Sequence, residues 1–216
     1  MAELPLIGVS RHRMETDGAG VTTLVASWGC PLRCKMCINP HAWKTDTRIY
    51  PVTARRLYDA LKIDDLYFQA TGGGVTFGGG EPLLHAEFIR EFRALCQDRW
   101  RLTVESCLNV PPENLYAVTQ VVDHFIVDIK DMRREIYRQY TGGDNARALE
   151  NLSALLQTVG PGRVTVRVPN IPGYNTPADV AVSVERLRAM GFETLDVFSY
   201  RVPETSPQPS STAGKP

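Results

Sequence analysis

The sequence predicts an α/β fold built on a parallel sheet. Six β-rich runs alternate with helical segments along the 216 residues, which is the order that crossover helices between parallel strands produce. The run His124–Lys130 (HFIVDIK) has a continuous apolar centre, as strands covered on both faces have. A polar group lies at the end of every run, where parallel sheets gather their chemistry. With right-handed crossovers such a sheet curls into a partial barrel or stays open, and the alternation alone does not separate the two.

The first half of the chain is predicted to contain three strands and two helices. Gly20–Ser27 is the first strand, because it is a β-rich run. Apolar residues at helical spacing predict a helix over Thr53–Ala70, with its first residue as the N-cap. The strand Gly74–Phe77, the helix His85–Asp98 and the strand Arg101–Ser106 follow.

The second half continues the alternation, and a helix that starts on prolines is predicted over Pro112–Val122. The remaining elements, in chain order, are the strand His124–Lys130, helical segments over Met132–Tyr140 and Ala146–Val159, the strand Arg163–Val168, the helix Pro177–Met190 and the strand Thr194–Tyr200. Residues 203–216 form a low-complexity run, which predicts a disordered tail behind a single domain over residues 1–202.

The composition is that of an ordinary globular protein. Lys+Arg and Asp+Glu number 24 each, so the chain has no basic field of the kind that nucleic acid or acidic lipid selects. No apolar run approaches the ~20 residues that span a bilayer, and the start MAELP lacks the regions of a signal peptide. Clustered thiols suit a reducing compartment. We therefore expect a cytoplasmic protein that binds neither nucleic acid nor a membrane.

Three of the five cysteines, Cys30, Cys34 and Cys37, fall within eight residues. Three thiolates on one short loop are typical of iron–sulfur ligation, and a [4Fe–4S] cluster with three protein ligands keeps one iron open. A zinc site with His41 as a fourth ligand and unligated thiols are the alternatives, whereas an odd number of cysteines in a tight loop disfavours a disulfide. The other two cysteines are predicted to be small buried hydrophobes, Cys96 and Cys107.

Residues around the cysteines extend this pattern. The loop reads Gly29-Cys30-Pro31-Leu32-Arg33-Cys34-Lys35, with Asp17-Gly18-Ala19-Gly20 upstream and Asn39-Pro40 downstream. In these motifs the chain resembles the radical S-adenosylmethionine (radical SAM) superfamily, and within it the activating enzymes of glycyl radical enzymes, such as pyruvate formate-lyase activase. The resemblance runs from residue 17 to about residue 201 and implies a (β/α)6 partial TIM barrel. Met36 departs from the family, which has an aromatic residue at this place.

The resemblance implies a [4Fe–4S] cluster that, once reduced, donates one electron to SAM. The products are methionine and a 5′-deoxyadenosyl radical, which abstracts hydrogen from a backbone glycine of a protein substrate. No catalytic side chain is implied beyond the cluster and SAM, and a flavodoxin- or ferredoxin-type protein is the implied electron donor. Two alternatives stay open: radical SAM modification of a ribosomal peptide or a small molecule, and a non-enzymatic iron–sulfur or zinc protein.

The same resemblance implies SAM-binding roles for the residues of two motifs. Gly79, Gly80 and Glu81 lie in a Gly-Gly-Glu motif that holds the amino group of the methionine part, and Glu81 acts there directly or by bracing the loop. Asp128-Ile129-Lys130 matches an Asp-x-Lys motif in which Lys130 pairs with the SAM carboxylate. A structural salt bridge from Lys130 to an acid is the alternative.

The remaining assignments come from the ends of the other strands. Ser106 takes the place of a hydroxyl residue near SAM, Arg167 is expected to contact SAM or a peptide backbone, and Arg201 replaces a SAM-binding His. The resemblance places the acidic residues of these strand ends near SAM and a monovalent cation. Oxygen ligands suit such a hard ion, so its candidate ligands are Glu105, Ser106 and Asp128.

The chain continues only briefly after its sixth predicted strand, whereas the activases continue well beyond it. We therefore expect a wide mouth at the strand ends. Small substrates need enclosure, but a peptide loop can itself close an open groove, so the expected substrate is a protein or peptide.

Overall fold

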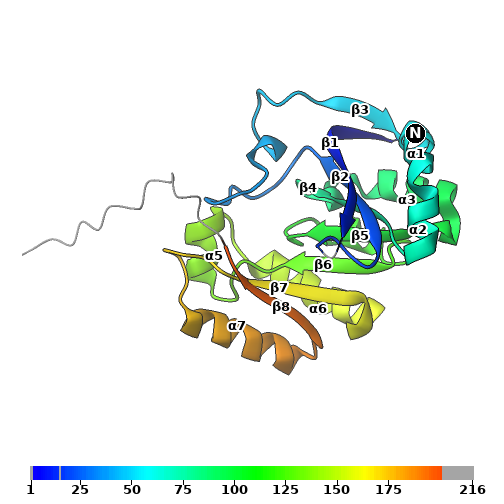
Figure 1. The fold of residues 1–216 in the computed structure, drawn as a ribbon. Coiled ribbons are helices and arrows are strands. Elements are labelled where there is room, and N and C mark those ends of the chain that lie inside the picture. Colours follow the sequence, from blue (N-terminus) through cyan, green and yellow to red (C-terminus); the bar gives the residue numbers. More distant parts are fainter. Residues whose placement is uncertain (1, 15, 201–216) are drawn as a thin grey trace, which may run out of the picture.

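A computed structural model describes residues 2–14 and 16–200. Its strands are β1 (Glu3–Met14), β2 (Val21–Ser27), β3 (Tyr50–Thr53), β4 (Gly74–Gly79), β5 (Arg101–Ser106), β6 (His124–Asp128), β7 (Val164–Asn170) and β8 (Thr194–Ser199). They form one sheet in the order β3-β1-β2-β4-β5-β6-β7-β8 (Figure 1). The predicted tail over residues 203–216 and the predicted site residue Arg201 lie outside the described residues.

The six predicted strands form the parallel part of this sheet. The strands β2, β4, β5, β6, β7 and β8 pair in parallel in the order in which the chain visits them. Among the described residues β3 and β8 are the two edges of the sheet, which is therefore unclosed. This confirms the predicted α/β class and is the arrangement of a partial barrel.

Two further strands, β1 and β3, correct the six-stranded prediction to eight. The strand β1 pairs antiparallel with both β2 and β3. Its sequence carries Pro5 and Gly8, which weaken the pattern of a strand, and β3 has only four residues with Pro51 among them. Proline is tolerated in β3 because this strand is an edge, and Pro5 and Pro51 are paired in register.

The α-helices of the described residues are α1 (Ala54–Leu61), α2 (Asp65–Thr71), α3 (Ala86–Cys96), α4 (Pro112–Tyr116), α5 (Arg134–Thr141), α6 (Ala146–Val159) and α7 (Pro177–Met190). Thr53 caps α1 as predicted, since its hydroxyl accepts a hydrogen bond from the Arg56 N–H (3.3 Å). The single helix predicted over Thr53–Ala70 is divided into α1 and α2. At their junction the buried Asp64 accepts a hydrogen bond from Thr23 of β2 (3.1 Å), which ties the chain to the sheet there.

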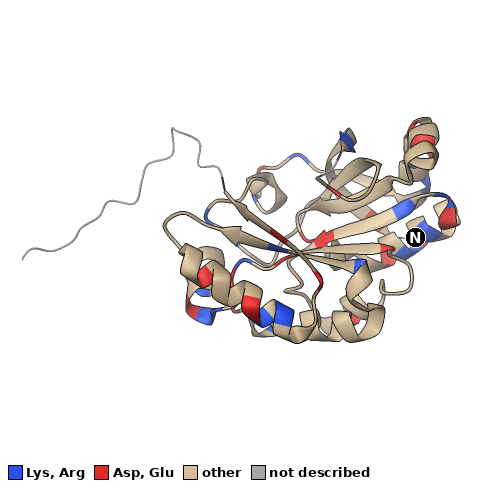
Figure 2. Ribbon diagram, turned by 60° about the horizontal axis from the view of Figure 1, so that its bottom comes forward, with Lys and Arg blue, Asp and Glu red and all other residues tan. Residues whose placement is uncertain are grey.

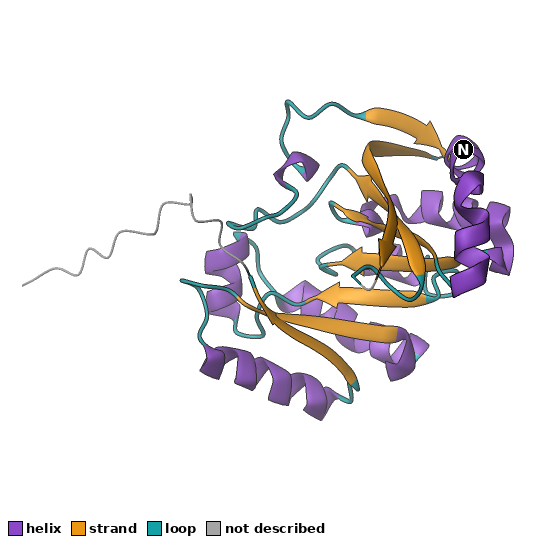
Figure 3. Ribbon diagram, viewed as in Figure 1, coloured by secondary structure: helices purple, strands orange, loops and turns teal. Residues whose placement is uncertain are grey.

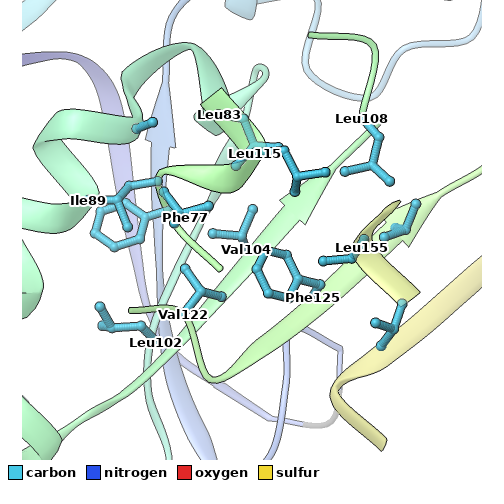
Figure 4. Packing of buried hydrophobic residues seen from close by; sticks show 14 of the residues in the cluster. Phe77, Leu83, Ile89, Leu102, Val104, Leu108, Leu115, Val122, Phe125 and Leu155 are labelled. Carbon is cyan, nitrogen blue, oxygen red and sulfur yellow. The ribbon is translucent and has the colours of Figure 1, made fainter. Parts of the chain in front are cut away.

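The hydrophobic core lies between the sheet and the helices on its outer side (Figure 4). Phe77, Val104 and Phe125 project from β4, β5 and β6, and they pack against Leu115 of α4 and Leu155 of α6. Each is fully buried, and burial of such a side chain contributes about 1.5–3 kcal/mol. The core therefore holds the strands, and with them their carboxyl ends, in fixed positions.

The outer surface is covered by helices of mixed charge. Figure 3 shows the strands at the centre with the helices around them, and long loops gathered toward one end of the sheet. Figure 2 shows Lys and Arg interspersed with Asp and Glu on the helices, in agreement with the balanced composition. Within residues 2–14 and 16–200, none of the helices has the length and apolar character required to cross a membrane.

Candidate active site

A cavity of about 550 Å³ opens where the parallel strands end. Its volume is in the range of small-molecule sites. The ends of β4, β5 and β7 and the loops after β2 and β6 form its wall. The predicted site residues that line it are Cys30, Cys34, Cys37, Gly79, Gly80, Glu81, Glu105, Ser106, Asp128, Lys130 and Arg167. Every predicted site residue that the structure describes is therefore brought to one place.

The cysteine loop is held in position by the end of α5. The N–H of Arg33 donates to the Thr141 carbonyl (2.9 Å), and the N–H of Lys35 donates to the Tyr140 carbonyl (3.0 Å). The Arg33 guanidinium also donates to the carbonyl of Cys30 (2.6 Å). These bonds define the course of the loop, so that its three thiols line the same cavity.

The three loop thiols are free and partly exposed. Burial raises the pKa of Cys34 to about 12, although the charge of Lys130 opposes this shift. No three of the described His, Cys, Asp and Glu side chains are grouped around the position of a single metal ion. A four-iron cluster does not need that grouping, because each thiolate binds a different iron atom. His41, the fourth ligand of the zinc alternative, is exposed and is not part of this cavity.

Gly79 and Gly80 allow the cysteine loop to pack against the end of β4. Gly79 has a φ of 84°, and a Cβ on Gly80 would lie 2.2 Å from the carbonyl oxygen of Gly29. The N–H of Gly80 donates to the carbonyl of Ser27 (2.9 Å), and the N–H of Glu81 donates to the carbonyl of Gly29 (2.7 Å). The two loops are thus joined backbone to backbone, and this close approach leaves no room for a side chain at Gly80.

Glu81 is buried and its carboxylate is fully engaged by the protein. One oxygen accepts hydrogen bonds from the Ser106 hydroxyl (2.8 Å) and the Leu83 N–H (3.1 Å), and the other accepts one from the Cys107 N–H (2.8 Å). Burial raises the pKa of Glu81, while these hydrogen bonds oppose the shift. In this structure Glu81 braces the loop, which is one of the two roles that the sequence left open.

Cys107 lies beside the cysteine loop, although the sequence predicted only a small hydrophobe. It is buried against Leu32 and Tyr137, with Cys30 and Cys34 packed on the same cluster. A hydrogen bond from its thiol lowers the pKa of Cys30, and the same bond, together with burial, raises the pKa of Cys107. Cys96, by contrast, is buried in the core as predicted.

Lys130 is a buried cation in the wall of the cavity. Its ammonium group donates to Asp128 and to the hydroxyl of Tyr200 (3.0 Å). Burial alone would lower the pKa of Lys130, but the Asp128 carboxylate outweighs it and raises this pKa well above the usual range. Oδ1 of Asp128 is buried and has no hydrogen-bond partner among the described residues. The salt bridge and an unused acceptor are thus both present at this strand end.

Arg167 links three strands to the turn between β1 and β2. Its guanidinium donates to Glu105 (2.9 Å) and to the carbonyl of Thr16, and it lies 3.5 Å from Asp196. Burial raises the pKa of Glu105, and the charge of Arg167 opposes this shift. The predicted cation ligand Glu105 is therefore already paired with a positive charge.

Several residues of the cavity were outside the sequence prediction. The strand β1 contributes Arg13 and the β1–β2 turn contributes the buried Asp17, and the two form an ion pair. The sequence marked Asp17 only as part of a motif, and Arg13 had no signal because β1 itself was not predicted. Tyr140 and Phe198 add an aromatic wall, for which no spacing in the sequence gave a signal.

Residues 25–196 match the family model of the radical SAM superfamily. The chain belongs to the radical SAM superfamily. The match runs from β2 into β8, and so it contains the cysteine loop and the strand ends that form the cavity. It confirms the family that the cysteine spacing and flanking motifs predicted.

Two curated relatives of this radical SAM protein are activating enzymes of glycyl radical enzymes, the group that the motifs predicted. The pyruvate formate-lyase-activating enzyme of Listeria monocytogenes is 35% identical over 150 residues, which cover 64% of this chain and 60% of the relative. The 4-hydroxyphenylacetate decarboxylase activating enzyme of Clostridium scatologenes is 28% identical over 220 residues, which cover 74% of this chain and 70% of the relative. The match thus spans about 60% of the length of the first relative.

Solved structures support the fold. A domain of the pyruvate-formate lyase-activating enzyme from Bacteroides vulgatus is 26% identical, with a TM-score of 0.53, over 64% of this chain and 86% of that domain. SuiB of Streptococcus suis, bound to its precursor peptide SuiA, has a TM-score of 0.63 at 12% identity, over 82% of this chain and 38% of that one. At this identity the second likeness concerns the fold alone.

Proposed function

We propose that this radical SAM protein holds a [4Fe–4S] cluster and SAM in the cavity at the strand ends and uses them to remove hydrogen from a protein substrate. On one-electron reduction the bound cluster and SAM supply methionine and a 5′-deoxyadenosyl radical, which takes up the hydrogen atom as 5′-deoxyadenosine. The observation that carries this proposal is the meeting of three thiols, the Gly-Gly-Glu loop and the Lys130–Asp128 pair in one cavity.

The donor set of the cavity fits both groups. Cys30, Cys34 and Cys37 offer the soft thiolate ligands that iron–sulfur clusters take. Among the described residues of the wall, the charged ones are five carboxylates and three cations, namely Asp17, Glu81, Glu105, Asp128 and Asp196 against Arg13, Lys130 and Arg167. SAM carries a sulfonium and an ammonium against one carboxylate, so an excess of negative charge in the wall favours it.

Individual residues have separate tasks in this proposal. Lys130 binds the carboxylate of SAM. The free Oδ1 of Asp128 accepts a hydrogen bond from the ammonium group of SAM or, together with Glu105, binds a monovalent cation. Ser106 reaches SAM only through Glu81, whose carboxylate it supports. Tyr140 and Phe198 exclude water from the cavity, which protects a reactive intermediate from side reactions.

The proposed substrate is a glycyl radical enzyme, whose backbone glycine loses its Cα hydrogen. The names of the relatives from Listeria monocytogenes and Clostridium scatologenes support this choice. The proposed reductant is a protein of the flavodoxin or ferredoxin type, because cleavage of SAM consumes one electron. Arg167 lines the cavity beside the β1–β2 turn, where it is suited to meet the backbone of an inserted loop.

Anaerobic reconstitution tests the proposal. Iron and sulfide are supplied to the purified protein, a chemical reductant and SAM are added, and 5′-deoxyadenosine and methionine are measured. The reduced protein is then mixed with candidate glycyl radical enzymes and the radical spectrum is recorded. A glycyl signal supports activation. A permanently altered peptide or small molecule favours the other radical SAM reactions, and a reconstituted cluster that leaves SAM intact contradicts the enzyme assignment.

The variant Lys130→Ala is expected to bind SAM about 5- to 150-fold more weakly, because a charged hydrogen bond of about 1–3 kcal/mol is lost. Equilibrium binding to the reconstituted protein measures this. The cluster content stays at the wild-type level, since Lys130 does not belong to the thiol set. Lys62→Ala, an exposed lysine paired with Asp59, is the matched control and keeps wild-type affinity. If Lys130→Ala and the wild type bind SAM with equal affinity, then Lys130 only forms a structural ion pair with Asp128.

A further inference from the structure

A second cavity, of about 720 Å³, adjoins the first. The two share Arg13, Leu24 and Asn39 in their walls, so the second one leads to the site at the strand ends. We call it the β1–β2 groove, because residues of these two strands form its floor. It is lined by Ile7, Gly8, Val9, Ser10, Leu24 and Ala26 from the strands, besides the loop residues described below.

Three of the strand residues in the floor of the β1–β2 groove are small, namely Gly8, Ser10 and Ala26. Gly8 is paired with Ala26 across the two strands, and Ser10 is paired with Leu24. A Cβ built on Gly8 would meet no atom within 4 Å, so the space above this glycine is open. The strand β1 pairs with β3 over Glu3–Leu6 alone, so its residues 8–10 at the groove pair only with β2. On its other side this stretch has no strand partner among the described residues, so an extended chain can pair with its backbone while side chains at the rim add selectivity.

The rim of the groove carries unpaired positive charge. Lys44 and Arg48, on the loop that follows the cysteines, are exposed, and neither forms an ion pair among the described residues. Arg48 lies over the ring of Tyr50, 4.9 Å from its centroid. Asp46 is the single carboxylate among the described residues that line the groove. Positive charge thus exceeds negative charge at this rim.

The loop that bears these charges is anchored. The indole N–H of Trp28 donates to the carbonyl of Lys44 (3.1 Å), and the hydroxyl of Thr47 donates to the carbonyl of His41 (2.7 Å). A ligand therefore meets charges on an ordered backbone, which reduces the entropy that binding must overcome.

We propose that the β1–β2 groove binds an extended segment of the protein substrate whose acidic side chains face Lys44 and Arg48, and that it directs the adjoining residues into the SAM cavity. The inference rests on the proposed function, since it concerns the substrate of the same site. An extended chain fits a groove with open space above Gly8 and an exposed rim, whereas a small molecule would need enclosure. Charge complementarity selects the acidic segment over a neutral or basic one.

Binding of labelled peptides tests the inference without requiring turnover. The probes are three peptides of equal length with a central glycine, flanked by glutamates, by serines or by lysines. Fluorescence anisotropy with the reconstituted protein and SAM is expected to show at least tenfold tighter binding of the glutamate peptide than of the lysine peptide. Lys44→Ala and Arg48→Ala are each expected to weaken that binding about two- to fivefold, as the loss of one exposed charge pair does.

Gly8→Val tests the floor of the groove, because valine suits a strand and its side chain enters the open space. This variant is expected to bind the glutamate peptide more than tenfold more weakly, while cluster content and SAM affinity stay unchanged. Arg55→Ala, on the exposed face of α1 outside the groove, is the control and leaves peptide binding unchanged. Lys44 and Arg48 lie on an exposed loop, so their alanine variants test peptide binding to the groove even if Gly8→Val does not fold.

Three results would overturn the inference: equal binding of the glutamate and lysine peptides, wild-type binding by all groove variants, or stronger binding of a single-stranded oligonucleotide than of the glutamate peptide. Failure of the proposed function gives a different result. In that case the wild-type protein does not cleave SAM, whereas the preference for the glutamate peptide and its dependence on Lys44 and Arg48 persist.

Discussion

Replacement of Cys30, Cys34 or Cys37 by Ala is expected to abolish both the brown chromophore of the reconstituted protein and all cleavage of SAM. Each thiolate holds one iron, and the three thiols come from one short loop with no spare cysteine between them. Iron and sulfide analysis, the visible spectrum and the yield of 5′-deoxyadenosine measure the effect. Iron content is expected to fall from four atoms per chain to a small fraction of that number.

Cys96→Ala is the matched control for the loop variants. Its thiol is buried in the core, apart from the cavity, and the variant is expected to bind the full cluster. Cys107→Ala also retains the cluster if this thiol only supports Cys30 through a hydrogen bond. A loop variant that kept four irons and cleaved SAM at the wild-type rate would refute the assignment of the ligands.

Glu81→Ala is expected to lower the free energy of unfolding by about 3 kcal/mol or more. The change leaves the Ser106 hydroxyl and the N–H groups of Leu83 and Cys107 buried without their acceptor, at about 1–3 kcal/mol each. Removal of the desolvated carboxylate offsets part of this cost. Urea unfolding of the cluster-free protein, with the slope of the transition compared between variants, measures the difference.

The control for Glu81→Ala is Glu87→Ala on the exposed face of α3. Among the described residues Glu87 forms an ion pair with Arg90 alone, at the surface, and such a pair contributes less than about 1 kcal/mol. If Glu81→Ala unfolds at the wild-type urea concentration but no longer binds SAM, then Glu81 acts on SAM directly and the bracing role is wrong.

Much of the fold could be predicted because buried parallel strands leave a strong pattern in a sequence. The apolar centre of β6 and the polar residues that end each strand predicted six strands and the edge of the sheet at which they meet. The strands β1 and β3 could not be predicted in the same way. Pro5 and Gly8 weaken the strand pattern of β1, and β3 has only four residues with Pro51 among them, which is compatible with a strand because β3 is an edge of the sheet.

The role of each site residue was harder to predict than its presence in the cavity. Motifs placed Glu81 in the cavity, but only the three-dimensional arrangement shows that its carboxylate is saturated by Ser106, Leu83 and Cys107. The same holds for Arg167, whose partners include the carbonyl of Thr16, 151 residues away in the chain. Contacts of this kind have no local signal, because they depend on how distant loops meet.

The attachment of the cysteine loop to α5 has a consequence for the order of events during synthesis. Arg33 and Lys35 find their partners at Thr141 and Tyr140, more than a hundred residues later in the chain. A chain that emerges from the ribosome with its N-terminus first exposes all three cysteines well before those partners exist. The thiols therefore acquire their final spacing only after α5 has docked. Cluster insertion is expected to follow folding, so that the finished sheet admits iron and sulfide to a site it has already shaped.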